Sequence, residues 1–273
     1  MTKIAFIGAG NMARAIVIGL VNNGTTGSDI MVANPSAEKR LALAEQFKVE
    51  QSDDNIEAAQ FADVIVLCVK PHLISDVCQQ MASAQANGAI DLSNKVFISV
   101  AAGTTVAQIQ QALAGHYPVV RVMPNTPSQL GLGMSGLFAS AEVSGQQKQL
   151  SEQLMTAVGK IIWLKTEAQI DDIIAVAGSA PAYFFLFMEA MEKHAQVLGF
   201  STQESRMLVQ QTALGAAQMV AQNDVPISQL RENVTSKGGT TQAALKQFND
   251  DGLQQLVTNA MNAAIKRAKE MAK

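Results

Sequence analysis

A glycine-rich segment near the N-terminus constrains the fold of this chain more than any other feature. The apolar run at residues 3–8 predicts a strand, and it leads directly into Gly8-Ala9-Gly10-Asn11-Met12-Ala13. Helical spacing of apolar side chains then begins at once, over residues 12–22. A strand, a turn with this glycine spacing and a helix together predict the first unit of a Rossmann dinucleotide-binding fold.

The chemistry of such a loop explains its residue types. Gly8 permits the tight turn, Gly10 has no side chain to block a pyrophosphate, and Ala13 is small enough for the helix to pack on the strand. Backbone N–H groups and the positive helix end then hold the diphosphate. A glycine-rich turn that binds nothing is the alternative.

Short β-branched runs alternate with longer helical patterns through the first part of the chain, which is typical of a parallel sheet with crossover helices. Residues 64–69 are apolar throughout, as expected when helices cover both faces of a sheet. We predict strands at residues 3–8, 29–34, 62–69, 95–101, 117–123, 133–139 and 159–164, and helices at 12–22, 37–47, 73–84, 106–113 and 145–158.

The character of the sequence changes after Trp163, where the β-branched runs stop and Ala, Gln, Met and Leu recur at helical spacing. We predict helices at residues 173–198, 203–222, 242–248 and 253–272. We therefore expect an α/β protein with two domains. Residues 1–163 form a Rossmann doubly wound parallel sheet, and residues 164–273 form an all-helical domain.

Composition indicates a folded protein without a nucleic-acid or membrane partner. The chain is 48% hydrophobic and 16% charged, with 20 basic and 23 acidic side chains that are close to balanced in both halves. A nucleic-acid or anionic-membrane surface needs clustered Lys and Arg. Between Lys95 and Glu142 the only charged residue is Arg121.

Cysteine usage and hydropathy indicate a cytoplasmic location. Cys68 and Cys78 have no second pair and no His cluster beside them, so we expect neither a disulfide framework nor a metal site. The N-terminal apolar stretch is too short for a signal peptide. Residues 173–188 are the most apolar segment, but they are shorter than the roughly 20 residues of a membrane helix, and we expect a buried helix there.

The second predicted strand ends at Asn34, where a dinucleotide would place its adenosine ribose. An Asp or Glu at this position accepts hydrogen bonds from both ribose hydroxyls and repels a 2′-phosphate. This chain has an uncharged amide instead, with Lys39 and Arg40 one helical turn further on. The pattern favours NADP over NAD as the cofactor, unless the two cations simply face water.

Two later strand ends carry further candidate cofactor contacts. Ligands of open α/β sheets lie outside the carboxyl ends of the strands, and the small side chains of residues 100–104 let a flat cofactor lie close to the backbone. Residues 69–72 end another strand. His72 follows a proline at a helix start, and we expect it to make a local contact and to have no catalytic role.

Three further segments carry a family resemblance. They are Arg121-Val122-Met123-Pro124-Asn125-Thr126-Pro127, Gly178-Ser179-Ala180-Pro181-Ala182-Tyr183 and Val234-Thr235-Ser236-Lys237-Gly238-Gly239-Thr240-Thr241. In this order, behind the glycine-rich loop, they resemble pyrroline-5-carboxylate reductase over essentially the whole chain. The family reduces a cyclic imine to L-proline with NADPH, the final step of proline biosynthesis.

The resemblance implies positions for both ligands. It places the cofactor against Gly8, Ala9, Gly10, Asn11, Met12, Ala13, Asn34, Asn55, Cys68, Val69, Lys70, Pro71, Val100, Ala101 and Ala102, with Met123 and Asn125 close to the nicotinamide. It places the substrate against Glu167, Asn233, Val234, Ser236, Gly238, Gly239, Thr240 and Thr241. Thr241 is the candidate catalytic residue, which hydrogen-bonds the ring nitrogen and relays its proton. NAD remains possible as a poorer cofactor.

The last segment also suits this chemistry by itself. Backbone N–H groups of a Gly-Gly turn that opens a helix can hold a carboxylate without an arginine, although the same pattern is compatible with an ordinary N-capped helix. The chain departs from the family at two positions, with Ala180 where Gly is common and Lys237 where Pro is common. Lys237 adds a cation near an anionic substrate and frees the backbone of the loop.

Three rival functions stay open. A β-hydroxyacid dehydrogenase shares the two-domain layout, but that family resembles a pattern with a catalytic Lys four residues after a Gly, and here Ala182 follows Gly178 at that spacing. An imine reductase of another kind is the second rival, and a non-catalytic dinucleotide-binding protein is the third. The helical domain is rich in Ala, Met and Leu, so we expect it to pair with another subunit, giving a homodimer or a multiple of dimers.

Overall fold

The computed structural model describes residues 2–271, which form two compact units. Among these residues, unit 1 comprises residues 2–179 and 264–271, and unit 2 comprises Ala180–Ala263. The described chain thus leaves unit 1 once and returns to it within its last helix. The composition of the sequence changes at residues 163–164. The units divide later, between Ser179 and Ala180, after the helical segment at residues 169–178.

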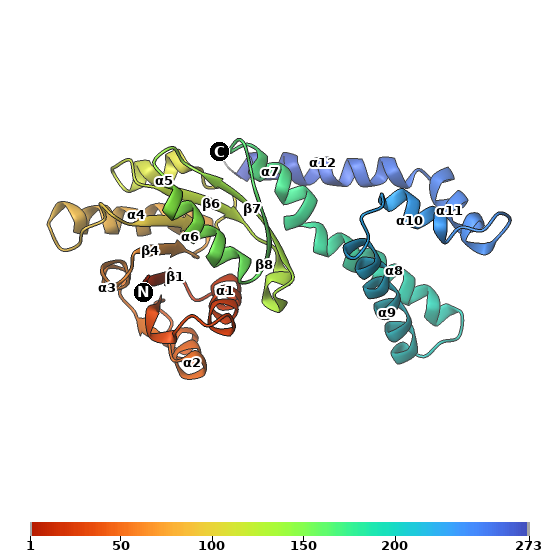
Figure 1. The fold of residues 1–273 in the computed structure, drawn as a ribbon, viewed down its shortest axis with the longest axis horizontal. Helices are drawn as coiled ribbons and strands as arrows, with labels where there is room; N and C mark the ends of the chain where they lie inside the picture. The colour runs from red at the N-terminus through yellow and green to blue at the C-terminus, as the bar shows by residue number, and fades with distance from the viewer. Residues whose placement is uncertain (1, 272–273) are drawn as a thin grey trace. The chain divides into compact units, whose positions relative to one another are not determined.

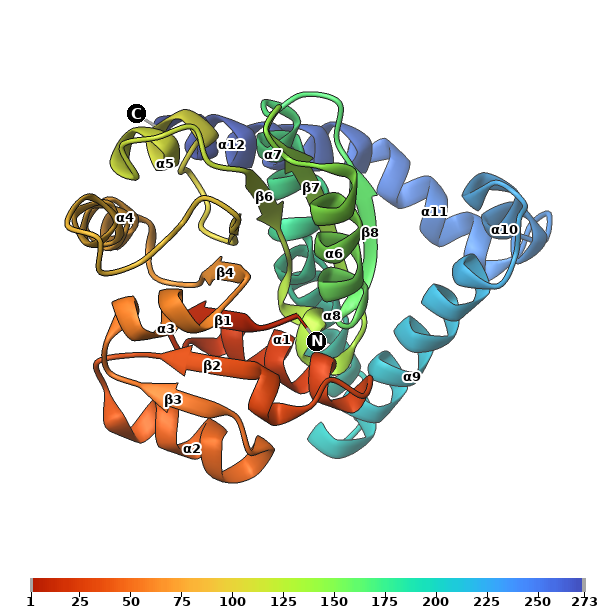
Figure 2. The same ribbon diagram turned by 60° about the vertical axis from the view of Figure 1, so that its left-hand side comes forward.

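Unit 1 is built on one eight-stranded sheet. Its strand order is β3-β2-β1-β4-β5-β6-β7-β8, which contains the Rossmann order from β3 to β6 (Figures 1 and 2). All neighbouring pairs are parallel except β6 and β7. The strands are β1 (Ile4–Ile7), β2 (Ile30–Ala33), β3 (Glu50–Ser52), β4 (Val64–Leu67), β5 (Val96–Ser99), β6 (Val119–Met123), β7 (Gly133–Ala139) and β8 (Gly159–Trp163).

Helices cover both faces of this sheet. Alternate residues of β1 point to opposite faces. Ile4 and Phe6 pack with the helices at residues 11–22, 37–47 and 145–156, whereas Ala5 and Ile7 pack with those at residues 55–61, 71–86 and 106–112. This explains why the central strands are apolar at every position. The helices are α1 (Asn11–Asn22), α2 (Ala37–Phe47), α3 (Asn55–Phe61), α4 (Pro71–Ala86), α5 (Val106–Ala112), α6 (Gly145–Thr156) and α7 (Gln169–Ile173), with shorter turns η1 (Gly27–Asp29), η2 (Thr126–Leu130) and η3 (Ile174–Gly178).

The predicted doubly wound sheet followed by a helical part is confirmed, with one exception to its parallel order. Strand β7 runs antiparallel to β6. Only residues 124–132, including the short turn η2, connect the two strands. A parallel connection needs a crossover of a dozen or more residues, so this link is too short for one.

Unit 2 contains only helices among the described residues: α8 (Ala180–Val197), α9 (Thr202–Ala221), α10 (Ile227–Asn233), α11 (Thr240–Asp250) and α12 (Leu253–Met271), the last of which continues into unit 1. Helices α8 and α9 lie side by side (Figure 1). Helix α8 also contacts α11, where the ring centroids of Phe187 and Phe248 lie 6.0 Å apart. Helix α9 begins with a capping box between Ser201 and Glu204.

The expected burial of the most apolar segment, residues 173–188, holds at Ala175 and Ala177 in η3 but is wrong for its continuation in α8. None of the described residues of α8 is buried. By length and composition alone, the continuous helical run Gln169–Val197 could cross a membrane, a criterion that apolar helices of other kinds also meet.

Candidate active site

The glycine-rich loop has the geometry that its sequence predicts. Gly8 has φ +106°, and a Cβ there would lie 2.8 Å from the carbonyl oxygen of Cys68, so a side chain is excluded twice over. A Cβ on Gly10 would meet nothing within 4 Å, which leaves open space where a ligand can approach the backbone. Helix α1 begins at Asn11 without a side-chain capping bond. The loop therefore fits the diphosphate of a dinucleotide.

Asn34 connects this loop to the end of β2. Its Oδ1 accepts a hydrogen bond from the Ala9 N–H at 3.3 Å, and its Nδ2 donates to the Ser36 carbonyl at 3.2 Å. Its backbone N–H donates to the Ser52 carbonyl at 3.1 Å. Asn34 thus fixes the diphosphate loop relative to the expected ribose position.

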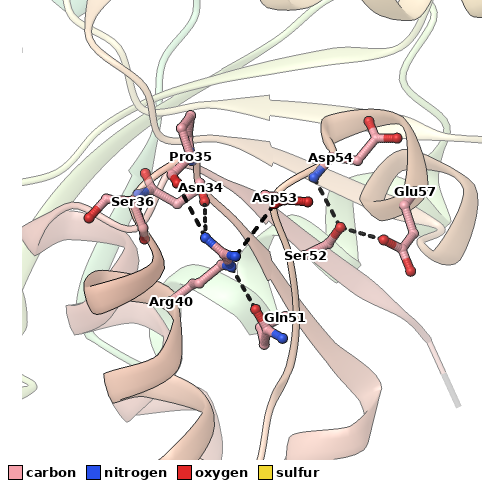
Figure 3. Close-up of polar contacts among 9 residues, drawn as sticks. All are labelled: Asn34, Pro35, Ser36, Arg40, Gln51, Ser52, Asp53, Asp54 and Glu57. Atoms are coloured by element: carbon pink, nitrogen blue, oxygen red, sulfur yellow. Dashed lines mark hydrogen bonds and ion pairs between the residues drawn. The ribbon is translucent and has the colours of Figure 1, made fainter.

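A second polar network, of Ser52, Asp54 and Glu57, sets the start of α3 (Figure 3). Helix α3 begins at Asn55. The Ser52 hydroxyl accepts from the Asp54 N–H at 3.0 Å and donates to the Glu57 carboxylate. Asp54 caps the helix by accepting from the Ile56 N–H at 2.8 Å. The polar strand β3 therefore delivers Asn55 to the same edge of the sheet as Asn34.

The ends of β4 and β5 bring the remaining predicted cofactor residues to that edge. The Cys68 N–H donates to the Ile7 carbonyl at 2.8 Å, and the Val100 N–H donates to the Leu67 carbonyl at 3.2 Å. These bonds continue the ladder, so residues 68–69 lie beside Gly8 and residue 100 lies beside the end of β4. Burial raises the pKa of the Cys68 thiol, so it is an uncharged neighbour for a dinucleotide.

Met123 ends β6, Asn125 follows it, and both side chains lie beside the π-helical turn η3. The Asn125 Nδ2 donates to the Ala177 carbonyl at 3.1 Å, and its Oδ1 accepts from the Met134 N–H at 2.9 Å. A Cβ on Gly178 would lie 2.7 Å from the Met123 Cε. The Asn125 side-chain amide thus bonds one backbone group of η3 and one of β7, and it holds η3 beside the end of β6, where Met123 lies.

The structure places Glu167 in unit 1 and pairs it with Arg121. Its Oε1 accepts from the Arg121 Nη1 at 2.8 Å and from the Val106 N–H at 2.7 Å. The carboxylate therefore neutralises Arg121 and caps the first turn of α5. The resemblance places Glu167 beside the substrate; in the structure it belongs to unit 1, and the other predicted substrate residues belong to unit 2.

Those other substrate residues lie in one segment that runs from the last residue of α10 through a turn to the first residues of α11. Gly238 has φ +74°, a left-handed conformation that glycine adopts without strain, and the Gly239 N–H donates to the Ser236 carbonyl at 3.0 Å. Helix α11 starts at Thr240, and its N-cap residue Gly239 has no side chain that could cap it. Asn233 and Val234 end α10, and Thr241 lies exposed in the first turn of α11.

Gln242 is a site residue that sequence reasoning missed. Its Oε1 accepts a hydrogen bond from the Gly238 N–H at 2.7 Å. An amide oxygen thus occupies a donor that is expected to face the substrate carboxylate. The spacing of four residues from Gly238, in the first turn of a helix, is the sequence signal that could have indicated it.

Metal chemistry has no candidate ligands here. Across residues 2–271, no group of three or more His, Cys, Asp and Glu side chains could hold a metal ion. Arg121, the single charged residue between Lys95 and Glu142, is paired with Glu167.

Comparison with known proteins identifies similar proteins over the full chain. Residues 167–271 match a family model for pyrroline-5-carboxylate reductase dimerisation, and residues 3–103 match one described as NADP oxidoreductase coenzyme F420-dependent. A pyrroline-5-carboxylate reductase of Vibrio alginolyticus is 54% identical, with 99% of this chain and 98% of the relative covered.

Solved structures agree with the sequence comparison. A pyrroline-5-carboxylate reductase from Coxiella burnetii is 43% identical, with a TM-score of 0.93 over 100% of this chain and 99% of that one. The Plasmodium falciparum pyrroline carboxylate reductase, described with NADP bound, is 28% identical, with a TM-score of 0.87 over 100% and 98%.

Proposed function

Because this chain belongs to the pyrroline-5-carboxylate reductase family, we propose that it reduces 1-pyrroline-5-carboxylate to L-proline with NADPH. The turn from Ser236 to Thr241 carries the assignment within the Rossmann reductases. It combines a left-handed Gly238, an uncapped helix start at Thr240 and an exposed hydroxyl at Thr241. Such a turn suits a small cyclic imine with one carboxylate.

The residues of the chain have distinct tasks in this reaction. When bound, NADPH supplies the hydride that forms the new C–H bond at the C=N carbon. The N–H group of Thr240 holds the substrate carboxylate. The N–H groups of Gly238 and Gly239 join it once they leave the Gln242 amide oxygen and the Ser236 carbonyl. Thr241 hydrogen-bonds the ring nitrogen and relays the proton that makes it an iminium, so the hydride adds at carbon and the proton stays on the product nitrogen.

The proposed cofactor residues are Gly8 to Ala13, Asn34, Asn55, Cys68 to Pro71, Val100 to Ala102, Met123 and Asn125. Support comes from their common position at the carboxyl edge of the sheet and from the open space at Gly10. Asn125 acts by shaping the nicotinamide surface. We keep residues 1–163 as the NADP-binding domain and residues 164–273 as the substrate and dimerisation domain, since the two family models match 3–103 and 167–271.

The dimerisation model indicates an oligomer, and we propose a homodimer or a multiple of dimers. The exposed apolar side chains of unit 2 support this, because they would lie in water in an isolated chain. They include Phe184, Phe185, Leu186, Phe187, Val197, Leu198, Met207, Leu208, Leu256 and Val257. A second copy would bury the apolar face of α8. We propose the cytoplasm as the location, in keeping with free thiols at Cys68 and Cys78.

An absorbance assay tests the function. Purified protein, NADPH and 1-pyrroline-5-carboxylate should give loss of the nicotinamide absorbance and formation of L-proline, with NADH used less well. Turnover of 3-hydroxy acids in place of the imine would instead favour the β-hydroxyacid dehydrogenase alternative. Ala182, where that class resembles a pattern with a catalytic Lys, argues against it. Binding of NADPH without any turnover would indicate a non-catalytic protein.

A further inference from the structure

Arg40 lies in the first turn of α2, directly behind the loop that would face the 2′-phosphate of NADPH. Its Nη1 donates to the carbonyls of Asn34 at 3.2 Å and Pro35 at 3.3 Å, and its Nε donates to the Gln51 Oε1 at 2.6 Å (Figure 3). Its Nη2 lies 3.6 Å from the Asp53 Oδ2. The side chain of Arg40 is only 14% exposed, so it faces the protein and not the solvent.

These bonds use most of what the guanidinium can donate. Arginine has five N–H donors in a planar fork, and three of them already donate to the protein. The nearby Asp53 carboxylate also offsets the positive charge. Arg40 is therefore poorly placed to act as a direct, free cation for a phosphate, which is the role that the sequence pattern suggests for it.

The bonds instead fix the direction of a peptide group. In a trans peptide the C=O and N–H point to opposite sides, so holding the Pro35 carbonyl on Arg40 turns the Ser36 N–H to the other side of the loop. Among the described residues, the exposed Ser36 hydroxyl makes no capping hydrogen bond to α2. The loop thus presents an N–H and a hydroxyl on the face opposite Arg40.

From this geometry we propose that Arg40 is a positioning residue that sets the preference for NADPH over NADH. It acts through the Asn34–Ser36 backbone, and Gln51 on β3 holds it in place. This inference rests on the proposed function, because it concerns the cofactor of that reaction. It assigns the selectivity to the fixed fork of the guanidinium and not to its charge.

Comparison of Arg40→Lys with Arg40→Gln separates these two causes. Lysine keeps the charge but cannot bond two carbonyls and Gln51 in the same plane. We expect both variants to lower the ratio of kcat/KM with NADPH to kcat/KM with NADH by about tenfold, through a higher KM for NADPH and with kcat nearly unchanged. Gln51→Leu, which leaves Arg40 in place, should give a smaller loss in the same direction.

Lys48→Gln is the matched control. It removes one charge from the other end of the same helix, about 12 Å along the axis, and its side chain is exposed. This variant should keep the wild-type ratio. Thermal melting of each variant checks folding, and Gln51→Leu carries the test if the Arg40 variants fail to fold.

A binding measurement removes the dependence on turnover. Calorimetric titration with adenosine 2′,5′-bisphosphate and with adenosine 5′-monophosphate isolates the contribution of the 2′-phosphate. The Arg40 variants should lose affinity for the bisphosphate only. Wild-type affinity in Arg40→Lys with loss in Arg40→Gln would overturn the inference, because charge alone would then suffice, and so would loss in Lys39→Gln with none in either Arg40 variant.

The same titration distinguishes a failure of the proposed function. If the wild-type protein binds the two nucleotides equally and oxidises neither reduced cofactor with the imine, the cofactor assignment itself is wrong. If the wild-type protein prefers the bisphosphate and the Arg40 variants behave like it, only the inference about Arg40 is wrong.

Discussion

Thr241 combines an exposed hydroxyl with a place in the first turn of α11. Thr241→Val removes the hydroxyl while keeping the branched shape, so it should lower kcat by about 10 to 100-fold without abolishing it, because an iminium is already activated. Thr241→Ser should retain most of the rate. Steady-state kinetics with the imine and NADPH would measure both.

Thr156→Val is the control for Thr241. The hydroxyl of Thr156 bonds only carbonyls of its own helix, those of Glu152 and Gln153, and it lies exposed on α6 in unit 1. Its loss should leave the kinetics unchanged. Full activity in Thr241→Val would remove Thr241 from the chemistry.

Cys78 should make stability fall at alkaline pH. Burial raises the pKa of its thiol to about 12, from an ordinary value of about 8.5 in the unfolded chain. Its stabilising contribution is therefore complete below pH 8.5 and is lost as the pH rises towards 12, by about 1.4 kcal/mol per pH unit, because only the unfolded state ionises in that range.

Chemical denaturation at several pH values between 9 and 11 measures this slope. Cys78→Ala should give a flatter decrease in the free energy of unfolding than the wild-type protein, since other ionising groups are common to both. Equal slopes would show that the thiol ionises in the folded state. The same burial predicts slow alkylation of Cys78 in the native protein at pH 8.

Single residues also show how far a sequence can specify a site. The glycine-rich loop could be predicted, because tight turning and close approach need glycine itself. The hydrogen-bond partners of Asn125 and Glu167 could not be predicted, since Ala177 and Arg121 lie 52 and 46 residues away along the chain. The orientation of Arg40 depends in turn on Gln51, in a strand that the hydrophobic pattern does not reveal.

At the scale of elements, the π-helical turn η3 makes a testable link to the expected nicotinamide position. A Cβ on Gly178 would push the flexible end of Met123, which can move at little cost to packing. Gly178→Ala should therefore lower kcat by about tenfold while changing the free energy of unfolding by less than about 1 kcal/mol. Kinetics and chemical denaturation measure the two effects.

Gly145→Ala is the control for Gly178, because Gly145 opens α6 and a Cβ there meets nothing within 4 Å. It should leave the kinetics unchanged. A wild-type kcat in Gly178→Ala would show that Met123 does not position the nicotinamide.

The elements themselves were predictable where hydrophobic periodicity is strong. All strands except β3 were predicted, whereas Glu50–Ser52 is short and polar and belongs to an edge. Helices α3 and α10, of seven residues each, were not predicted. Helix α5 has the same length but was predicted, because Val106, Ile109 and Leu113 recur at helical spacing. The antiparallel β7 could have been predicted, because the nine residues between the predicted strands 117–123 and 133–139 leave no room for a crossover.

For the whole molecule, the exposed apolar surface of unit 2 predicts an obligate assembly. The wild-type protein should sediment at twice its chain mass of 29.0 kDa, or at a multiple of that. Leu186→Glu puts a charge on the 67% exposed position of α8 and should shift the protein towards monomer, because burying an unpaired carboxylate is costly. Sedimentation velocity would show the shift.

Leu41→Glu is the control for the assembly, since Leu41 is an exposed leucine on α2 in unit 1. This variant should sediment like the wild-type protein. A wild-type protein that stays monomeric at micromolar concentration would contradict the assembly.

The division of the whole chain was only partly predictable. The end of the β-branched runs after Trp163 correctly indicates where helices begin. Composition does not reveal which partner a helix packs against, and Ile170, Ala175 and Ala177 are buried in unit 1. The return of residues 264–271 to unit 1 depends on similarly distant contacts.

The two crossings of the chain between the units affect when each unit can finish folding during synthesis. Residues 264–271 complete unit 1, and Ala268 is buried there, yet the whole of unit 2 precedes them in synthesis. The Rossmann sheet therefore emerges from the ribosome before residues 264–271, which complete its unit, have been made. Unit 1 stays incomplete, and the apolar surface of α8 stays uncovered, until α12 has been made. Although unit 1 begins the chain, it can finish folding only at the end of translation.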